Sequence, residues 1–187
     1  MITIIVIGLA VVVLAILGLA ATKPSVMRIE RSARIDAAPG RVFPLINDLR
    51  KWQVWSPWER LDPAMQRAYG GAEAGPGAFY EWEGNKKAGK GRMQIAESTA
   101  PSRVTIDLHF IQPFENRGRV DFLLRDTTGG TDVTWAMESP SSFMTKVMCV
   151  FVNMDRLVGR DFEAGLARLK EVAEAADQSP ANRSSTR

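Results

Sequence analysis

The sequence predicts an α+β fold, in which one transmembrane helix precedes a domain of antiparallel strands and a long C-terminal helix. An unbroken apolar run occupies residues 2–21, apolar and polar residues then alternate as far as about residue 138, and helical spacing returns after Ser141. A chain of 187 residues is long enough for one anchor and one domain with its own core. We therefore predict an anchor over residues 1–22, a linker over 23–25, a domain over 26–176 and a disordered tail over 177–187.

The apolar run contains Thr3 as its one polar side chain. At about 1.5 Å of rise per helical residue, it spans roughly the 30 Å hydrocarbon core of a bilayer. A cleaved secretory signal is the alternative, because Gly18-Leu19-Ala20 is an acceptable cleavage pattern. The run lacks a basic n-region and is longer than the usual signal core of about 7–15 residues. These features favour an uncleaved single-pass anchor.

The charges beside the apolar run favour a cytoplasmic position for the predicted domain. Basic residues follow the apolar run at Lys23, Arg28, Arg31 and Arg34, and positive charge tends to remain cytoplasmic. The whole chain carries 24 basic and 21 acidic residues, a net charge of +3. Because the basic residues form no long block, we expect no nucleic-acid partner.

The first strand and the helices after it follow from spacing. Ile29, Arg31, Ala33 and Ile35 share one strand face, and Pro39 suits the first turn of a helix. The apolar positions that recur at helical spacing up to about residue 52 are Val42, Phe43, Leu45, Ile46 and Leu49.

The middle of the chain predicts further antiparallel strands near residues 65–70, 78–84, 90–98, 102–112, 116–126 and 131–138. Residues 104–110 alternate strictly, which indicates a strand with one buried face. Gly84-Asn85 and Gly129-Gly130 supply turn positions where positive φ is cheap.

The C-terminal part predicts one long amphipathic helix or two, and Asn153 or Asp155 can cap the second. We expect its apolar stripe to cover the strands. The stripe consists of Phe143, Val147, Phe151, Met154, Val158, Phe162, Leu166 and Leu169.

Five short motifs resemble the START-like (SRPBCC) superfamily, in particular its membrane-anchored bacterial branch of polyketide cyclase or dehydrase type. They are residues 52–59 (WQVWSPWE), 80–85 (YEWEGN), 89–93 (GKGRM), 133–135 (VTW) and 153–155 (NMD). The similarity extends from about Ser25 to Ala176. It implies the helix-grip fold, a curved antiparallel sheet wrapped around a long C-terminal helix, with an apolar cavity between them.

Aromatic and methionine side chains are the candidate ligand-binding residues, because they give large and adaptable apolar walls. Ordinary core packing is the alternative for each of them. The predicted set is Trp55, Trp58, Tyr80, Trp82, Met93, Phe110, Trp135, Met137, Phe151 and Met154. We expect Trp52 to lie with Trp55 and Trp58 near the cavity mouth.

Few residues support catalysis or metal binding. His109 is the single histidine and falls on the polar face of its strand, while Cys149 is the single cysteine. These residues cannot build the usual zinc sites, and the glycines lack the spacing of a phosphate-binding loop. We therefore predict no metal and no cofactor.

Two functions remain open from the sequence. The first is a tethered module that binds a hydrophobic small molecule or lipid without catalysis. The second is a cyclase- or dehydratase-like enzyme in which a buried carboxylate, Glu81, Glu83, Glu138 or Asp155, acts as acid or base. Binding of a protein partner by the basic segment after the anchor is a third possibility, and the sequence does not indicate an oligomeric state.

Overall fold

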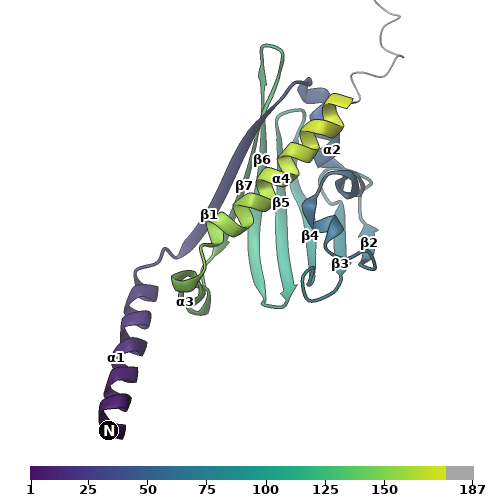
Figure 1. Ribbon diagram of the computed structural model, residues 1–187. Coiled ribbons are helices and arrows are strands. Elements are labelled where there is room, and N and C mark those ends of the chain that lie inside the picture. Colours follow the sequence, from purple (N-terminus) through teal and green to yellow (C-terminus); the bar gives the residue numbers. More distant parts are fainter. Residues whose placement is uncertain (176–187) are drawn as a thin grey trace, which may run out of the picture.

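The computed structural model describes residues 1–175, which form an N-terminal helix and a layered α+β domain (Figure 1). Helix α1 (Ile2–Ala21) projects from one end of the domain. Residue 176 and the predicted tail over 177–187 lie outside the described residues.

Seven antiparallel strands form one sheet in the order β1-β7-β6-β5-β4-β3-β2. Each strand from β2 to β6 pairs with the next one along the chain, and β1 pairs with β7 at the edge of the sheet. The strands are β1 (Val26–Ile35), β2 (Gln66–Gly70), β3 (Phe79–Glu83), β4 (Lys90–Thr99), β5 (Arg103–Gln112), β6 (Asn116–Thr127) and β7 (Gly130–Pro140). They match the segments predicted from alternation closely.

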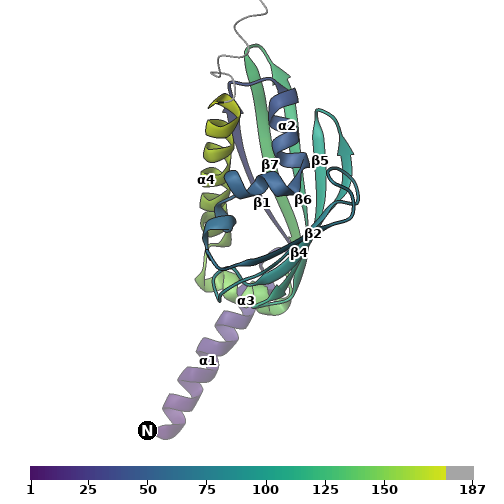
Figure 2. The same cartoon turned by 90° about the vertical axis from the view of Figure 1, so that its right-hand side faces the viewer.

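Alternation along the strands gives the sheet one buried and one outer face. On β6, Val120, Phe122 and Leu124 are buried, whereas Leu123 between them is exposed. The β4–β5 pairing shifts register between Ile95 and Glu97, and such a bulge bends a strand and increases its twist. The sheet is curved, and helices occupy its inner side (Figure 2).

Short helices follow β1 on the inner side of the sheet, and the first of them lies toward the end furthest from α1 (Figure 2). They are α2 (Pro39–Asn47), η1 (Leu49–Val54) and η2 (Pro57–Arg60). Pro39 occupies the first turn of α2, as predicted, and Asp48 caps η1 by accepting from the Arg50 amide at 3.0 Å. Val42 and Ile46 of α2 are fully buried.

The last helix, α4 (Met154–Ala175), lies along the inner side of β1 (Figures 1 and 2). Its buried positions Phe162, Leu166 and Leu169 follow helical spacing, as predicted. Asn153 caps it, accepting from the Arg156 amide at 2.9 Å. With the curved sheet, α4 completes the helix-grip fold that the sequence predicts.

Helix α3 (Phe143–Phe151) differs from the prediction, because it does not extend the stripe that covers the strands. It begins at Ser142, whose hydroxyl accepts from the Thr145 amide at 3.1 Å, and the chain becomes extended at Val152. None of its residues is fully buried. The helix lies at the end of the domain where α1 enters (Figure 2), and Phe143 and Phe151 of the predicted stripe are exposed there.

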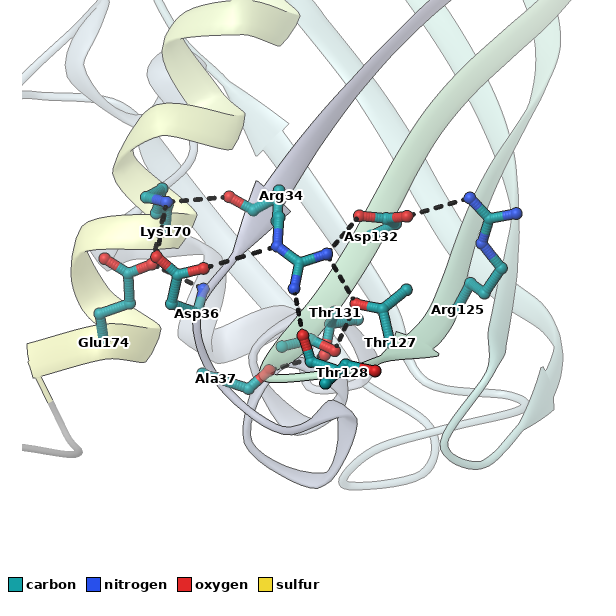
Figure 3. A network of polar contacts seen from close by, with 11 residues as sticks. Arg34, Asp36, Ala37, Arg125, Thr127, Thr128, Thr131, Asp132, Lys170 and Glu174 are labelled. Carbon is teal, nitrogen blue, oxygen red and sulfur yellow. Dashed lines mark hydrogen bonds and ion pairs between the residues drawn. The ribbon is translucent and has the colours of Figure 1, made fainter.

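A polar network closes the opposite end of the domain (Figure 3). The Lys170 amine of α4 donates to the Arg34 carbonyl at 3.0 Å and contacts Glu174 at 3.1 Å, and the Glu174 carboxylate accepts from the Asp36 amide at 2.7 Å. Arg34 also donates to the Thr127 hydroxyl at 2.9 Å. These contacts hold the C-terminal half of α4 against the end of β1 and the β6–β7 turn.

Candidate functional site

A cavity of about 600 Å³ lies between the sheet and the helices. Strands β1 and β3–β7 contribute side chains to it, and η1, η2, α3, α4 and several connections between the elements contribute the rest. Its side chains are mostly apolar, and their conspicuous members are tryptophan, phenylalanine and methionine. A curved sheet that packs on a straight helix leaves this space, because the two surfaces diverge.

Eight of the ten predicted ligand-binding residues line this cavity. They are Trp58, Tyr80, Trp82, Met93, Phe110, Trp135, Met137 and Met154. Trp52 also lines it, but its side chain is 4% exposed and packs on Trp55 and Phe122, so it lies in the inner wall and not near the mouth as expected.

The prediction for Trp55 is wrong in its placement, because the residue does not line the cavity. Its side chain is 2% exposed, and its indole N–H donates to the Leu45 carbonyl at 2.9 Å. The ring packs 4.7 Å from Trp52 and 5.6 Å from Trp135, centroid to centroid. Trp55 therefore belongs to the core behind the cavity wall.

The prediction for Phe151 is also wrong in its placement. The residue ends α3 and is 69% exposed, outside the cavity. Helical spacing alone placed it in line with Phe162 and Leu166, but the break at Val152 gives α3 a different direction from α4.

Three stacked or edge-on aromatic rings form the wall beside α4. Trp135 stacks on Phe162 with centroids 4.2 Å apart, and Trp58 meets Trp135 edge-on at 5.5 Å. The buried indole N–H of Trp135 has no hydrogen-bond partner within residues 1–175. A bound molecule with an acceptor oxygen can supply that partner.

A polar group interrupts the apolar wall where η2 meets β3. Glu59 lines the cavity with its side chain 6% exposed. One carboxylate oxygen accepts from the Tyr80 hydroxyl at 2.6 Å, and the other accepts from Arg67 Nε at 2.7 Å. Burial, together with the hydrogen bond to Glu59, raises the pKa of Tyr80, so this hydroxyl stays protonated and donates.

The sequence reasoning missed Glu59, although it lies inside the tryptophan-rich motif at residues 52–59. The available signal was Arg67, a basic residue eight positions later at the start of a strand. Pairing the two required the knowledge that η2 turns back on β2.

The carboxylates considered from the sequence do not line the cavity. Glu81 pairs with Arg92 at 2.6 Å and Glu83 with Lys90 at 2.7 Å, on the outer face where alternation placed them. The other two candidates also form surface ion pairs, Glu138 with Arg28 and Asp155 with Arg31. All four side chains are at least 45% exposed.

His109 and Cys149 lie outside any cluster suited to a metal ion. His109 Nε2 lies 3.0 Å from the Glu115 carboxylate on the outer face. Within residues 1–175 no group of three or more histidine, cysteine, aspartate or glutamate side chains could hold a metal.

The cavity mouth lies at the α1 end of the domain. Phe114 and Glu115 of the β5–β6 connection, Asn116 at the start of β6, and Met144 and Met148 of α3 line the cavity there. The mouth is therefore rimmed by apolar and polar side chains together.

Helix α1 is long and apolar enough to cross a membrane, and no other helix within residues 1–175 is. A signal sequence near an N-terminus meets the same criteria.

Solved structures share this fold. A protein from Chromobacterium violaceum matches with a TM-score of 0.57 and 16% identity over 81% of this chain and 99% of its own. One from Rhizobium leguminosarum matches with a TM-score of 0.59 and 11% identity over 80% and 95%. DynU16, from the dynemicin biosynthetic locus, matches with a TM-score of 0.56 and 13% identity over 80% of this chain and 48% of its own.

At these identities the structures establish the fold and not the function. No curated protein matches the chain. The family model described as polyketide cyclase / dehydrase and lipid transport matches residues 27–174, from the first strand to the end of α4. The motifs, the helix-grip fold and this match agree, and the chain belongs to the polyketide cyclase / dehydrase and lipid transport family.

Proposed function

We propose that this protein is a membrane-tethered module that binds a hydrophobic small molecule or lipid in the cavity between the sheet and α4. The observation that carries the proposal is the cavity itself, about 600 Å³ in volume and walled mainly by aromatic, aliphatic and methionine side chains. Ligand pockets typically measure about 300–1,000 Å³ and combine apolar walls with few polar groups. Glu59, Tyr80 and the free indole N–H of Trp135 are such polar groups.

The tether is α1, whose 20 residues reach about 30 Å as a helix. Lys23 and the arginines of β1 follow it, which favours a cytoplasmic domain. A tethered binder stays close to a ligand that dissolves in the bilayer.

Native mass spectrometry of the full chain purified from cells tests the proposal directly. We expect an apolar molecule to remain bound, and solvent extraction to release it for identification. The matched variants are Leu108→Trp, which fills the cavity from β5, and Leu123→Trp, which adds the same ring to the outer face of β6. We expect the first variant to lose the molecule and the second to retain it. Equal retention by both, or no bound molecule in the unaltered chain, contradicts the proposal.

Glu59 favours a second candidate function, a cyclase- or dehydratase-like enzyme. Its carboxylate borders the cavity beside the protonated hydroxyl of Tyr80, and two such groups can move a proton between them and a bound substrate. The test compares Glu59→Gln and Tyr80→Phe with the unaltered chain, using the extracted molecule and chromatography with mass detection. Turnover that disappears in both variants while binding persists supports the enzyme. No change in the molecule with the unaltered chain rejects it.

A further inference from the structure

We infer that the apolar rim of the cavity mouth inserts into the membrane surface, so that the ligand passes directly between the bilayer and the cavity. The rim consists of Phe114, Phe143, Met144, Met148 and Phe151. The inference rests on the proposed function and adds the source of the ligand, a molecule dissolved in the membrane.

The rim is apolar and exposed, which is unusual for the end of a soluble domain. Phe114 and Met144 are each 66% exposed. The four rim residues of α3 fall within about 140° around the helix, at 3.6 residues per turn. Thr145 and Lys146 point to the other side and are less exposed than these four. The helix thus exposes apolar side chains and turns polar ones toward the protein.

Strand register places the rim at the end where α1 enters. Val26 at the start of β1 pairs with Pro140 at the end of β7, and Glu138 of β7 pairs with Arg119 near the start of β6. The β5–β6 connection with Phe114 therefore lies beside the start of α3. Figures 1 and 2 show α3 next to the domain end of α1.

The link between α1 and the domain is too short to let the rim move far from a bilayer. Four residues, 22–25, separate α1 from β1, and they span at most about 14 Å. Ser25 is also bonded to the α3 region, because its carbonyl accepts from the Ser141 amide at 2.8 Å and its hydroxyl from the Lys146 amine at 3.0 Å.

Two observations indicate that lipid contacts this surface: the apolar surface of α1 runs on into α3, and basic residues lie at this end of the domain. The apolar surface of α1 continues into α3, since the two helices contact each other. Lys23 directly follows α1, and Arg117 near the start of β6 is 75% exposed, 3.9 Å from the Glu115 carboxylate. Such exposed cations bind anionic headgroups beside inserted aromatic residues.

The rim and the cavity share residues. Phe114, Met144 and Met148 are exposed and also line the cavity. A membrane in contact with them therefore meets the cavity mouth, and an apolar molecule can enter without crossing water, where its solvation is unfavourable.

Depth-dependent fluorescence quenching tests the inference on the full chain in vesicles of phosphatidylcholine and phosphatidylglycerol. Cys149→Ser removes the native thiol, and Val152→Cys or Leu123→Cys then carries an environment-sensitive fluorophore. Val152 adjoins the rim, and Leu123 lies on the outer face of the sheet. We expect doxyl-labelled lipids to quench the label at position 152 and not that at 123. Equal quenching, or none at 152, overturns the inference.

A second measurement separates this inference from the proposed function. The double variant Phe143→Glu and Phe151→Glu keeps the cavity wall intact, because neither residue lines it. We expect it to retain ligand supplied in detergent but to take ligand from vesicles about tenfold more slowly, since charged residues oppose insertion. Unchanged uptake from vesicles overturns the inference and leaves the binding function standing. The quenching experiment is also performed in nanodiscs that each hold one chain. If quenching at position 152 disappears there, the signal comes from contact between two copies, and the inference is overturned.

Discussion

Glu59 is a buried carboxylate with a donor on each oxygen, Tyr80 on one and Arg67 on the other. Substitution by glutamine keeps the size but places an amide N–H₂ against one of these donors. A buried polar group that loses its partner costs about 1–3 kcal/mol. We therefore expect Glu59→Gln to lower the free energy of unfolding by this amount in urea titrations.

The matched control for this prediction is Glu83→Gln. Glu83 pairs with Lys90 at the surface, with both side chains at least 40% exposed, and such pairs contribute about 0–1 kcal/mol. Equal losses in the two variants would show that Glu59 is no more important to stability than a surface carboxylate.

Asp121 gives a prediction on pH. Burial opposes its ionisation, but the Thr105 hydroxyl at 2.6 Å and Arg103 at 2.8 Å outweigh it and lower the pKa of Asp121. A carboxyl whose pKa is lower in the folded state stabilises the fold above its unfolded pKa of about 3.9, and this contribution is lost as the pH falls through the folded value. We expect Asp121→Asn to show a weaker fall in stability below about pH 4, measured by urea unfolding across the acid range.

At the scale of single residues, the sequence predicted a cavity wall of aromatic and methionine side chains, and two of the ten named residues, Trp55 and Phe151, lie elsewhere. Alternation correctly put Tyr80, Trp82 and Trp135 on the inner face of the sheet. Trp55 was misplaced because it lies in the turn between two short 3-10 helices, where no periodicity separates a core position from a cavity wall. Glu59 was missed because its partners come from two strands that only the tertiary structure brings to it.

At the scale of elements, α4 depends on a glycine for its approach to the sheet. A Cβ built on Gly165 would lie 2.8 Å from a ring carbon of Trp135, and that ring is fixed by its stack on Phe162. We expect Gly165→Ala to lower the melting temperature despite the helix propensity of alanine, worth up to about 1 kcal/mol.

Gly40→Ala is the matched control in α2. A Cβ at Gly40 meets nothing within 4 Å, so the propensity gain should appear without a clash. We expect a small rise in melting temperature by circular dichroism. A rise of the same size for Gly165→Ala would show that α4 can move away from the sheet at no cost.

The elements themselves were largely predictable, because strict alternation and turn glycines identify strands without reference to their neighbours. Helix α3 was the exception. Its Phe143, Val147 and Phe151 have the same spacing as the buried stripe of α4. Periodicity shows that these residues share one face of a helix, but it does not show what that face contacts.

At the scale of the whole molecule, the short link between α1 and the domain should control exchange with vesicles. Inserting a flexible glycine-serine segment between Lys23 and Pro24 lengthens the link in an exposed stretch, where insertions are tolerated. It lowers the effective concentration of the domain at the surface. We expect slower uptake of ligand from vesicles and an unchanged melting temperature.

A rigid insert of equal length serves as its comparison, and a helical segment should slow uptake more than the flexible one because it holds the mouth away from the bilayer. Uptake that is insensitive to both inserts would contradict the role of the link.

Strand β1 has a mechanical consequence for a protein held by α1. The chain leaves α1 and, after four residues, enters a strand whose ten residues all pair with β7. Hydrogen bonds of an antiparallel pair run perpendicular to the strands, so a pull on the anchor along β1 loads the ladder in shear. The hydrogen bonds between β1 and β7 then bear the load at the same time. We expect the domain to withstand a pull along β1 that would open a hairpin pulled apart from one end, where the bonds break one after another.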